Sequence, residues 1–424
     1  MPYTFGSCAA ESNRVGQGTH AAVVRLASFM RAVSGHGSGP GWFLQLDVRN
    51  FFNSIDLPIL FGLVNRRLKR AVLQGRIDTA EAHDLSWLTY VILKQDFKTE
   101  TRYRCSPAEL ARVPEYKRLT AAPPGKGLPI GNLTSQFLAN VYLNELDQFV
   151  KHQLKCRYYL RYVDDLILVD PDPGRLRGWG EAIAEFLQER LQLALKPNWT
   201  LRPVTDGADF LGYIVRPDYR LVRRRVIGNL RVKLAAFARD QVTATALRLP
   251  PGPRDRLRAE LASYLGHFGH ADAWRLVHSL LVRHAWLGRL FRLRGGRLAP
   301  RWEPAQATSL RAQVDWFRCD LRPAIPLVQI GNRVALFEPE LGLALARAPW
   351  LGRWRSVRPE ARPGLTPGLS WPVSCIKGLG RSLRQAGQAY AFIAEEGYRR
   401  GGIKRRVLRY LFIGPTTATR HQRG

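Results

Sequence analysis

Residues 160–169 read LRYVDDLILV and place two adjacent carboxylates, Asp164 and Asp165, between apolar runs that are typical of β-strands. A short polar pair between two such runs predicts a β-hairpin, and Asp is a common turn residue. A turn alone does not explain two acidic residues, because neighbouring like charges call for a counter-charge, usually a cation. On this stretch alone, a plain turn and a metal site remain open alternatives.

The net charge indicates which kind of partner to expect. The 424 residues contain 65 Lys plus Arg and 34 Asp plus Glu, a formal charge of +31, so the expected partner is a polyanion such as nucleic acid. A membrane surface is the competing partner, but we expect no membrane association, since no apolar run is long enough to span a bilayer and no signal peptide is recognised. Five scattered cysteines without a C-x-x-C pair favour a reducing cytoplasm.

A third carboxylate ends an earlier apolar run. Residues 41–56 read GWFLQLDVRNFFNSID, and the predicted strand ends at Asp47 before the chain turns through Phe51 and Phe52 into a helix. Taken alone, Asp47 is better explained as a helix cap or loop residue.

Two helices are predicted around the acidic pair. The Gly- and Pro-rich loop at the start of residues 123–150 allows close backbone approach to a ligand, although an ordinary helix entry is the alternative. Helical spacing within this segment and within residues 174–195 predicts two buried faces, formed by Phe137, Val141, Leu143 and Leu146 and by Ile183, Phe186, Leu187 and Leu191. Residues 195–200 and 209–215 are predicted as short strands.

The order of these motifs resembles the palm of a reverse transcriptase. Asp47 matches the first catalytic aspartate, residues 162–165 the Y-x-D-D box, and Lys196 the motif D lysine. The primer grip matches Phe210, Leu211, Gly212 and Tyr213. The resemblance covers roughly residues 13–290 and implies an RNA-directed DNA polymerase.

The resemblance implies two Mg²⁺ ions about 4 Å apart and a role for each site residue. It assigns Asp47 and Asp164 to bridge the ions, the Val48 carbonyl to the triphosphate-side ion, and Asp165 to the primer side. The implied nucleotide-binding residues are Val48, Phe51, Phe52, Ile130, Gly131, Gln136 and Lys196. Phe52 would crowd the sugar 2′-position unless it is a core residue, and Lys196 would protonate pyrophosphate unless it is only an exposed lysine at a strand edge.

Residues 128–136, LPIGNLTSQ, narrow the resemblance. Ile130 stands where many reverse transcriptases have Gln, and together with NRVGQGTHAAV and SYLGHFGHADAWRL this resembles the enzymes of diversity-generating retroelements. Such enzymes copy a template RNA into adenine-mutagenised cDNA that replaces a variable region of a target gene, a process called mutagenic retrohoming. The implied partners are template RNA, cDNA, deoxynucleoside triphosphates and a basic accessory variability protein, monomeric or oligomeric.

The expected fold is α/β (α+β), a right-hand polymerase with truncated fingers, palm and helical thumb, plus a small mixed α/β module. In that family a basic fingers segment normally precedes GTHAAV, and this chain begins almost at that point. Either its true start lies further upstream or part of the fingers is absent. The expected boundaries are partial fingers at 1–40, palm at 41–215, thumb at 216–292, linker at 293–308 and module at 309–424. We read His267 and His270 in the thumb as packing or phosphate contacts, because no cysteine accompanies them.

The C-terminal module resembles the mismatch-recognition domain of the bacterial mismatch-repair ATPase, on the strength of residues 328–331 and of AYAFIAEEG after a predicted helix. Arg333 and Ala335 replace the mismatch-reading Phe and Glu, so the module is expected to bind duplex or an accessory protein. Residues 356–370 are expected to be a flexible insertion. Alternative functions are a defence-associated or group II intron-type reverse transcriptase, and a non-catalytic RNA-binding protein.

Overall fold

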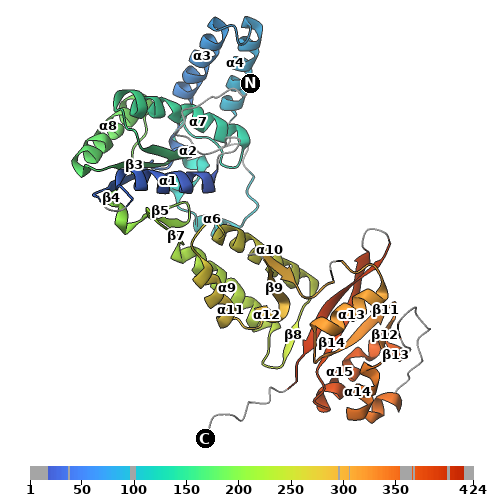
Figure 1. The fold of residues 1–424 in the computed structure, drawn as a ribbon. Coiled ribbons are helices and arrows are strands. Elements are labelled where there is room, and N and C mark those ends of the chain that lie inside the picture. The colour runs from blue at the N-terminus through green and yellow to red at the C-terminus, as the bar shows by residue number, and fades with distance from the viewer. Residues whose placement is uncertain are drawn as a thin grey trace. The chain divides into compact units, whose positions relative to one another are not determined.

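The computed structural model describes residues 18–36, 39–95, 102–294, 297–304, 306–353, 365, 368–398 and 402–414. The chain divides into two compact units, Met1–Arg223 and Arg224–Gly424, which can be followed in Figure 1 by colour along the chain. Among the described residues, no helix combines the length and the hydropathy needed to cross a membrane.

The first unit is organised around a four-stranded antiparallel sheet with the order β2-β3-β1-β4. Its strands are β1 (Trp42–Asp47), β2 (Tyr159–Tyr162), β3 (Asp165–Asp170) and β4 (Thr200–Pro203). Five consecutive residues of β3 are buried, because helices α1 (Thr19–Val33) and α8 (Pro173–Leu191) both pack on the sheet (Figure 1). An apolar run without alternation is what a strand covered on both faces requires.

The remaining helices of the first unit begin at recognisable signals. Asp56 caps α3 (Leu57–Leu73) by accepting a hydrogen bond from the Ile59 amide, and Asp78 forms a capping box at the start of α4 (Thr79–Lys94). The other helices are α2 (Phe51–Ser54), α6 (Pro107–Ala111) and α7 (Leu133–Gln148), which a π-helical turn (Phe149–Gln153) extends, with 3₁₀ turns at Glu115–Lys117, Leu119–Ala121 and Val204–Asp206.

The predicted helical faces are mostly confirmed. Leu143, Leu146, Ile183, Leu187 and Leu191 are buried in one core, with Val141 and Phe186 packed against it. The prediction for Phe137 is wrong, because its side chain is 55% exposed near the start of α7. Ser135, Leu138 and Ala139 are the buried residues around it, so Phe137 lies off the inward face of the helix.

The second unit begins with helices. They are α9 (Arg224–Gln241), α10 (Pro251–Phe268), α11 (Trp274–Arg283) and α12 (Leu287–Leu290), with strand β8 (Ala246–Arg248) between the first two. Leucines of α9, α10 and α11 meet around a small apolar cavity, so the arginine-rich segment has a core of its own.

The segment expected to be a linker, 293–308, is largely structured where it is described. Strands β9 (Phe291–Arg294) and β10 (Arg297–Pro300) form an antiparallel hairpin, and Trp302 after it is fully buried. Glu303 forms ion pairs with Arg258 of α10 and with Arg405 near the C-terminus. Buried Trp and paired charge hold this connection in place, which Gly, Pro and charge content could not reveal.

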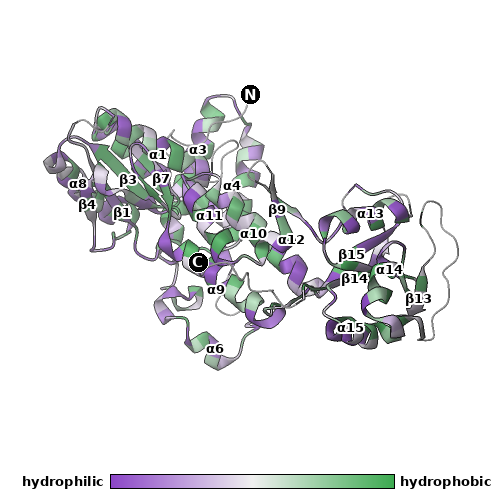
Figure 2. Cartoon of the chain, turned by 60° about the horizontal axis from the view of Figure 1, so that its bottom comes forward, coloured by the Kyte–Doolittle hydropathy of each residue, from purple (hydrophilic) through white to green (hydrophobic). Residues whose placement is uncertain are grey.

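The C-terminal part contains a six-stranded sheet with the order β13-β12-β11-β14-β15-β8. It comprises β11 (Ile325–Ile330), β12 (Arg333–Leu336), β13 (Leu369–Pro372), β14 (Tyr390–Tyr398) and β15 (Lys404–Phe412), with helices α13 (Leu310–Asp320), α14 (Glu340–Arg347) and α15 (Ile376–Gln385) and 3₁₀ turns at Pro349–Arg353 and Val373–Cys375. Each of the helices α13, α14 and α15 carries both hydrophobic and hydrophilic residues (Figure 2). Strand β8, which lies between helices α9 and α10, pairs with β15. The helical segment and the C-terminal part of the second unit are therefore joined through one sheet.

Arg333 and Ala335, which replace the mismatch-reading residues, both make contacts inside the protein. Arg333 donates from Nε to the Ser370 hydroxyl at 2.9 Å and from Nη2 to the Ser370 carbonyl at 2.7 Å, and Ala335 is buried. The insertion predicted at 356–370 lies largely outside the described residues, although its last two residues belong to β13.

Candidate active site

Asp47 is the last residue of β1 and Asp165 the first of β3, and they are direct partners in the antiparallel register. The predicted hairpin is present, but Val163 and Asp164 form its turn, one position before the acidic pair that was expected to form it, and Val163 is in the left-handed region at φ 57°. The Asp164 carbonyl accepts a hydrogen bond from the Val48 amide at 3.4 Å. The fold therefore brings all three predicted catalytic carboxylates to one end of one sheet.

The electrostatics of this cluster show an excess of negative charge. Burial, followed by the charges of Asp164 and Asp47, raises the pKa of Asp165 to about 6. Burial and the charge of Asp47 also raise the pKa of Asp164. The Asp47 Oδ1 atom is buried without a hydrogen-bond partner in the described structure. Such a group of acids is stabilised by any cation that can reach it.

Lys196 supplies part of the positive charge that stabilises this acidic cluster. Its ammonium contacts Asp47 Oδ2 at 2.5 Å, and its backbone amide donates to the Asp47 carbonyl at 2.8 Å. The hydrogen bond to Asp47 raises the pKa of Lys196. Lys196 lies outside β4, although its neighbour Leu195 forms an isolated bridge with Val48, so the predicted strand through Lys196 is reduced to a bridge.

The carboxylates of Asp47, Asp164 and Asp165 suit a hard divalent cation, but they are not arranged as a complete set of metal ligands. Across the described ranges, no three acidic, His or Cys side chains are grouped as metal ligands, and the Lys196 ammonium lies on Asp47 instead. Carboxylate oxygens are the ligands that Mg²⁺ prefers. The unpartnered Oδ1 of Asp47 and the raised pKa values of Asp164 and Asp165 are what a cation between them would relieve.

A buried ion pair behind the turn was missed by sequence reasoning. The side chains of Arg161 in β2 and Asp147 in α7 are both fully buried and bind each other through two hydrogen bonds. The available signal was an arginine inside an apolar strand, because a charged residue at a core position needs a buried partner. The identity of that partner was not readable from the pattern.

The predicted nucleotide-binding residues differ in accessibility. Phe51 is a core residue, and its role in nucleotide binding stays a prediction. Phe52 is partly buried, with its ring centroid 5.3 Å from that of Phe51. Part of its side chain therefore packs against the core, and the rest is exposed. Ile130 is 74% exposed beside Gly131 at φ 107°, whereas Gln136 lies partly buried in the first turn of α7.

The predicted primer grip forms a β-hairpin. Strands β5 (Ala208–Phe210) and β6 (Tyr213–Val215) pair antiparallel, and β7 (Arg220–Val222) adds a third strand. Leu211 and Gly212 form the turn with φ values of 50° and 90°, as a tight hairpin with two left-handed residues requires. Phe210 and Tyr213 are buried, whereas Leu211 and Gly212 in the turn are partly exposed.

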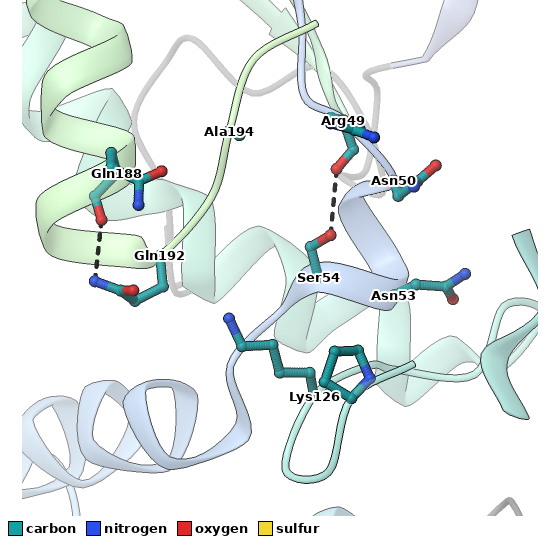
Figure 3. A pocket seen from close by; sticks show the side chains of 9 residues that line it. Arg49, Asn50, Asn53, Ser54, Lys126, Gln188, Gln192 and Ala194 are labelled. Atoms are coloured by element: carbon teal, nitrogen blue, oxygen red, sulfur yellow. Dashed lines mark hydrogen bonds between the residues drawn. The ribbon is translucent and has the colours of Figure 1, made fainter. Parts of the chain in front are cut away.

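A polar pocket of about 270 Å³ opens next to the strand that carries Asp47. It is lined by Arg49, Asn50, Asn53, Ser54, Pro123, Lys126, Gln188, Gln192 and Ala194. In Figure 3 the Lys126 side chain reaches toward Ser54 and Gln192, whose polar groups donate to the carbonyls of Arg49 and Gln188. Side-chain amides and two cations make this an environment suited to oxygen-rich anions.

Comparisons with known proteins agree with the palm assignment. Residues 22–215 match the family model described as reverse transcriptase (RNA-dependent DNA polymerase). The group II intron-encoded protein LtrA of Lactococcus lactis subsp. cremoris is 28% identical over 129 residues, which are 30% of this chain and 16% of that protein. This chain therefore spans only a small part of that relative.

Similar solved structures include telomerase from Candida albicans, in complex with a fragment of telomeric RNA, with TM-score 0.31 and 10% identity over 66% of this chain and 47% of that one. Telomerase from Candida tropicalis has TM-score 0.35 and 8% identity over 62% and 46%, respectively. The residues that match the reverse transcriptase family model, 22–215, include the sheet that carries the three aspartates.

Proposed function

We propose that this protein is an RNA-directed DNA polymerase whose catalytic residues are Asp47, Asp164 and Asp165. The observation that carries the proposal is their convergence at one end of the sheet, where burial and mutual repulsion raise the pKa of Asp165 to about 6. An acidic cluster of this kind is an arrangement for binding divalent cations, and the basic chain supplies the affinity for nucleic acid.

The chemistry divides among these residues and their neighbours. Two Mg²⁺ ions would neutralise the triphosphate and lower the pKa of the primer 3′-hydroxyl. Asp47 and Asp164 would hold both ions, the Val48 carbonyl the triphosphate side, and Asp165 the primer side. Lys196 is paired with Asp47 and would donate a proton to the departing pyrophosphate once the cations take its place on that carboxylate.

We further propose that the cDNA is made with frequent errors opposite adenine, as in a diversity-generating retroelement. Support comes from Ile130, whose aliphatic side chain is exposed on the loop before α7, where many relatives have a hydrogen-bonding Gln. The proposed partners are a template RNA and a basic accessory variability protein. The proposed location is the cytoplasm of a bacterium or archaeon, or of a cell infected by a phage that encodes the protein.

The C-terminal sheet is proposed to bind duplex nucleic acid or the accessory protein, without taking part in the chemistry. Its support is the basic composition of YRRGGIKRRVLRY, residues 398–410, which favours phosphate contacts with a steep salt dependence. Mismatch reading is not part of the proposal, since Arg333 is bound to Ser370.

A group II intron-type reverse transcriptase is the second candidate. It is favoured by the 28% identity to LtrA. It would differ from the retroelement enzyme in the RNA that it copies, and the catalytic palm would be the same. An inexact repeat and a template sequence in the flanking DNA would support the retroelement, and intron boundaries would support this second candidate.

Primer extension tests the polymerase assignment directly. Asp164→Asn should abolish Mg²⁺-dependent cDNA synthesis on an RNA template while RNA binding is retained, because the basic surface supplies the binding. Asp218→Asn, which changes an exposed acid in the loop between β6 and β7, is the matched control and should extend primer normally. Extension by Asp164→Asn at the rate of the unmodified protein would contradict the proposal.

A further inference from the structure

The buried ion pair behind the acidic turn is fully removed from solvent. Arg161 Nε donates to Asp147 Oδ1 at 2.8 Å and Nη2 donates to Oδ2 at 2.7 Å, and neither side chain is exposed. Burial alone would lower the pKa of Arg161, but the Asp147 carboxylate more than offsets this. Two charges taken out of water are weak evidence for stabilisation, because apolar residues of similar volume often serve equally well. The pair therefore calls for another explanation.

The third guanidinium nitrogen points to that explanation. Arg161 Nη1 donates to the Val163 carbonyl at 2.9 Å and to Asn140 Oδ1 at 3.2 Å. Val163 is a β-branched residue at φ 57°, a conformation that such residues rarely adopt and that surrounding contacts must maintain. The hydrogen bond acts on the peptide that joins Val163 to Asp164.

Asp147 is itself held by more than Arg161. Tyr159, also in β2, donates its hydroxyl hydrogen to Asp147 Oδ1 at 2.9 Å, and the Val48 amide reaches the Asp164 carbonyl on the other side of the turn at 3.4 Å. A path of hydrogen bonds therefore runs from α7 through Asp147 and Arg161 to the Val163 carbonyl, in the peptide that precedes Asp164.

We propose that Asp147 and Arg161 are positioning residues, which hold the Val163–Asp164 turn so that the carboxylates of Asp164 and Asp165 converge with Asp47 on the same cations. This rests on the proposed polymerase function. The planar guanidinium is needed because it binds the carboxylate with two nitrogens and still has one for the turn, whereas an ammonium cannot span both.

The test compares three variants of the full chain. Arg161→Lys keeps the charge but loses the forked geometry. The double variant Asp147→Leu with Arg161→Met removes both charges, so it leaves no buried unpaired ion if the single substitution fails to fold. Glu145→Gln is the matched control, because it removes an ion pair with Arg67 from the same helix without touching the turn.

Each variant is examined by thermal unfolding, by titration with Mn²⁺ alone, and by kcat and KM for primer extension on an RNA template. We expect Arg161→Lys and the double variant to bind Mn²⁺ about tenfold more weakly and to lose kcat by about a hundredfold, with little change in KM. A misplacement of about 1 Å has an effect of this size. Glu145→Gln should match the unmodified protein in both readouts.

The proposal is overturned if the folded double variant binds Mn²⁺ and turns over like the unmodified protein, because the pair would then be purely structural. It is equally overturned if activity falls only in proportion to the folded fraction. Mn²⁺ binding separates this inference from the function on which it rests. An unmodified protein that binds Mn²⁺ through Asp164 but extends no primer would refute the polymerase and leave the positioning role standing.

Discussion

Asp165→Asn should stabilise the metal-free protein at neutral pH while abolishing the proposed polymerase activity. The pKa of Asp165 rises from 3.8 to about 6 on folding, chiefly through burial and then through Asp164 and Asp47. A carboxylate with a raised pKa is disfavoured as an anion in the folded state. The penalty is therefore absent below about pH 4, grows between pH 4 and 6, and is complete above pH 6.

The magnitude follows from the pKa. Each tenfold change in proton affinity corresponds to about 1.4 kcal/mol, so ionising Asp165 costs the folded state about 3 kcal/mol at pH 7.5. Solvent reaches part of this side chain, and screening reduces the figure to about 1 to 2 kcal/mol. For a unit of this size, such a gain raises the Tm by roughly 3 to 6 °C.

The assay is thermal unfolding in EDTA at pH 4 and at pH 7.5, with Asp218→Asn as an exposed control. Asp165→Asn should unfold at a higher temperature than the unmodified protein at pH 7.5 and at nearly the same temperature at pH 4. Added Mg²⁺ should narrow the difference, because the cation relieves the same repulsion in the unmodified protein. Equal or lower stability of the variant at pH 7.5 would refute the reasoning.

Three further predictions concern other parts of the chain. Ile130→Gln should lower misincorporation opposite template adenine about ten- to a hundredfold without changing the Tm, since Ile130 is 74% exposed, and sequencing of cDNA from one template checks it. Lys196→Met should lower the Mg²⁺ concentration needed for half-maximal activity, because it removes a cation that competes for Asp47. It should also slow turnover if Lys196 protonates pyrophosphate, and a steady-state Mg²⁺ titration measures both effects. Glu396→Gln removes the bidentate partner of buried Arg254 and should destabilise the second unit by about 3 kcal/mol; calorimetry should show an unchanged transition for the first unit.

A truncation near residue 295 would remove the proposed binding module at the C-terminus. If that module supplies affinity without chemistry, the truncated chain should keep its metal site and bind more weakly. The cut would also remove β15, which pairs with β8, and Glu396, which pairs with Arg254 of α10. We therefore expect it to destabilise α10, so weaker binding of RNA or accessory protein by the truncated chain would not by itself locate the binding surface.

The sequence by itself determined the elements around the site. The apolar runs that end at Asp47 and surround Asp164 and Asp165 predicted an acid-ended strand and a hairpin, and both are present. The repeat of Ile183, Leu187 and Leu191 predicted the buried face of α8. These predictions succeeded because strand and helix periodicity are local properties, set by which face of an element avoids water.

Only the tertiary structure decided which residues lie opposite one another. Asp147 and Arg161 come from different elements, and Lys196 reaches Asp47 from 149 positions away along the chain. The side chains of Phe51, Phe210 and Tyr213 are buried, which their motifs did not indicate. Periodicity shows that a side chain points inward but not what it meets there, because that depends on how distant segments pack and on which buried charges must find a partner.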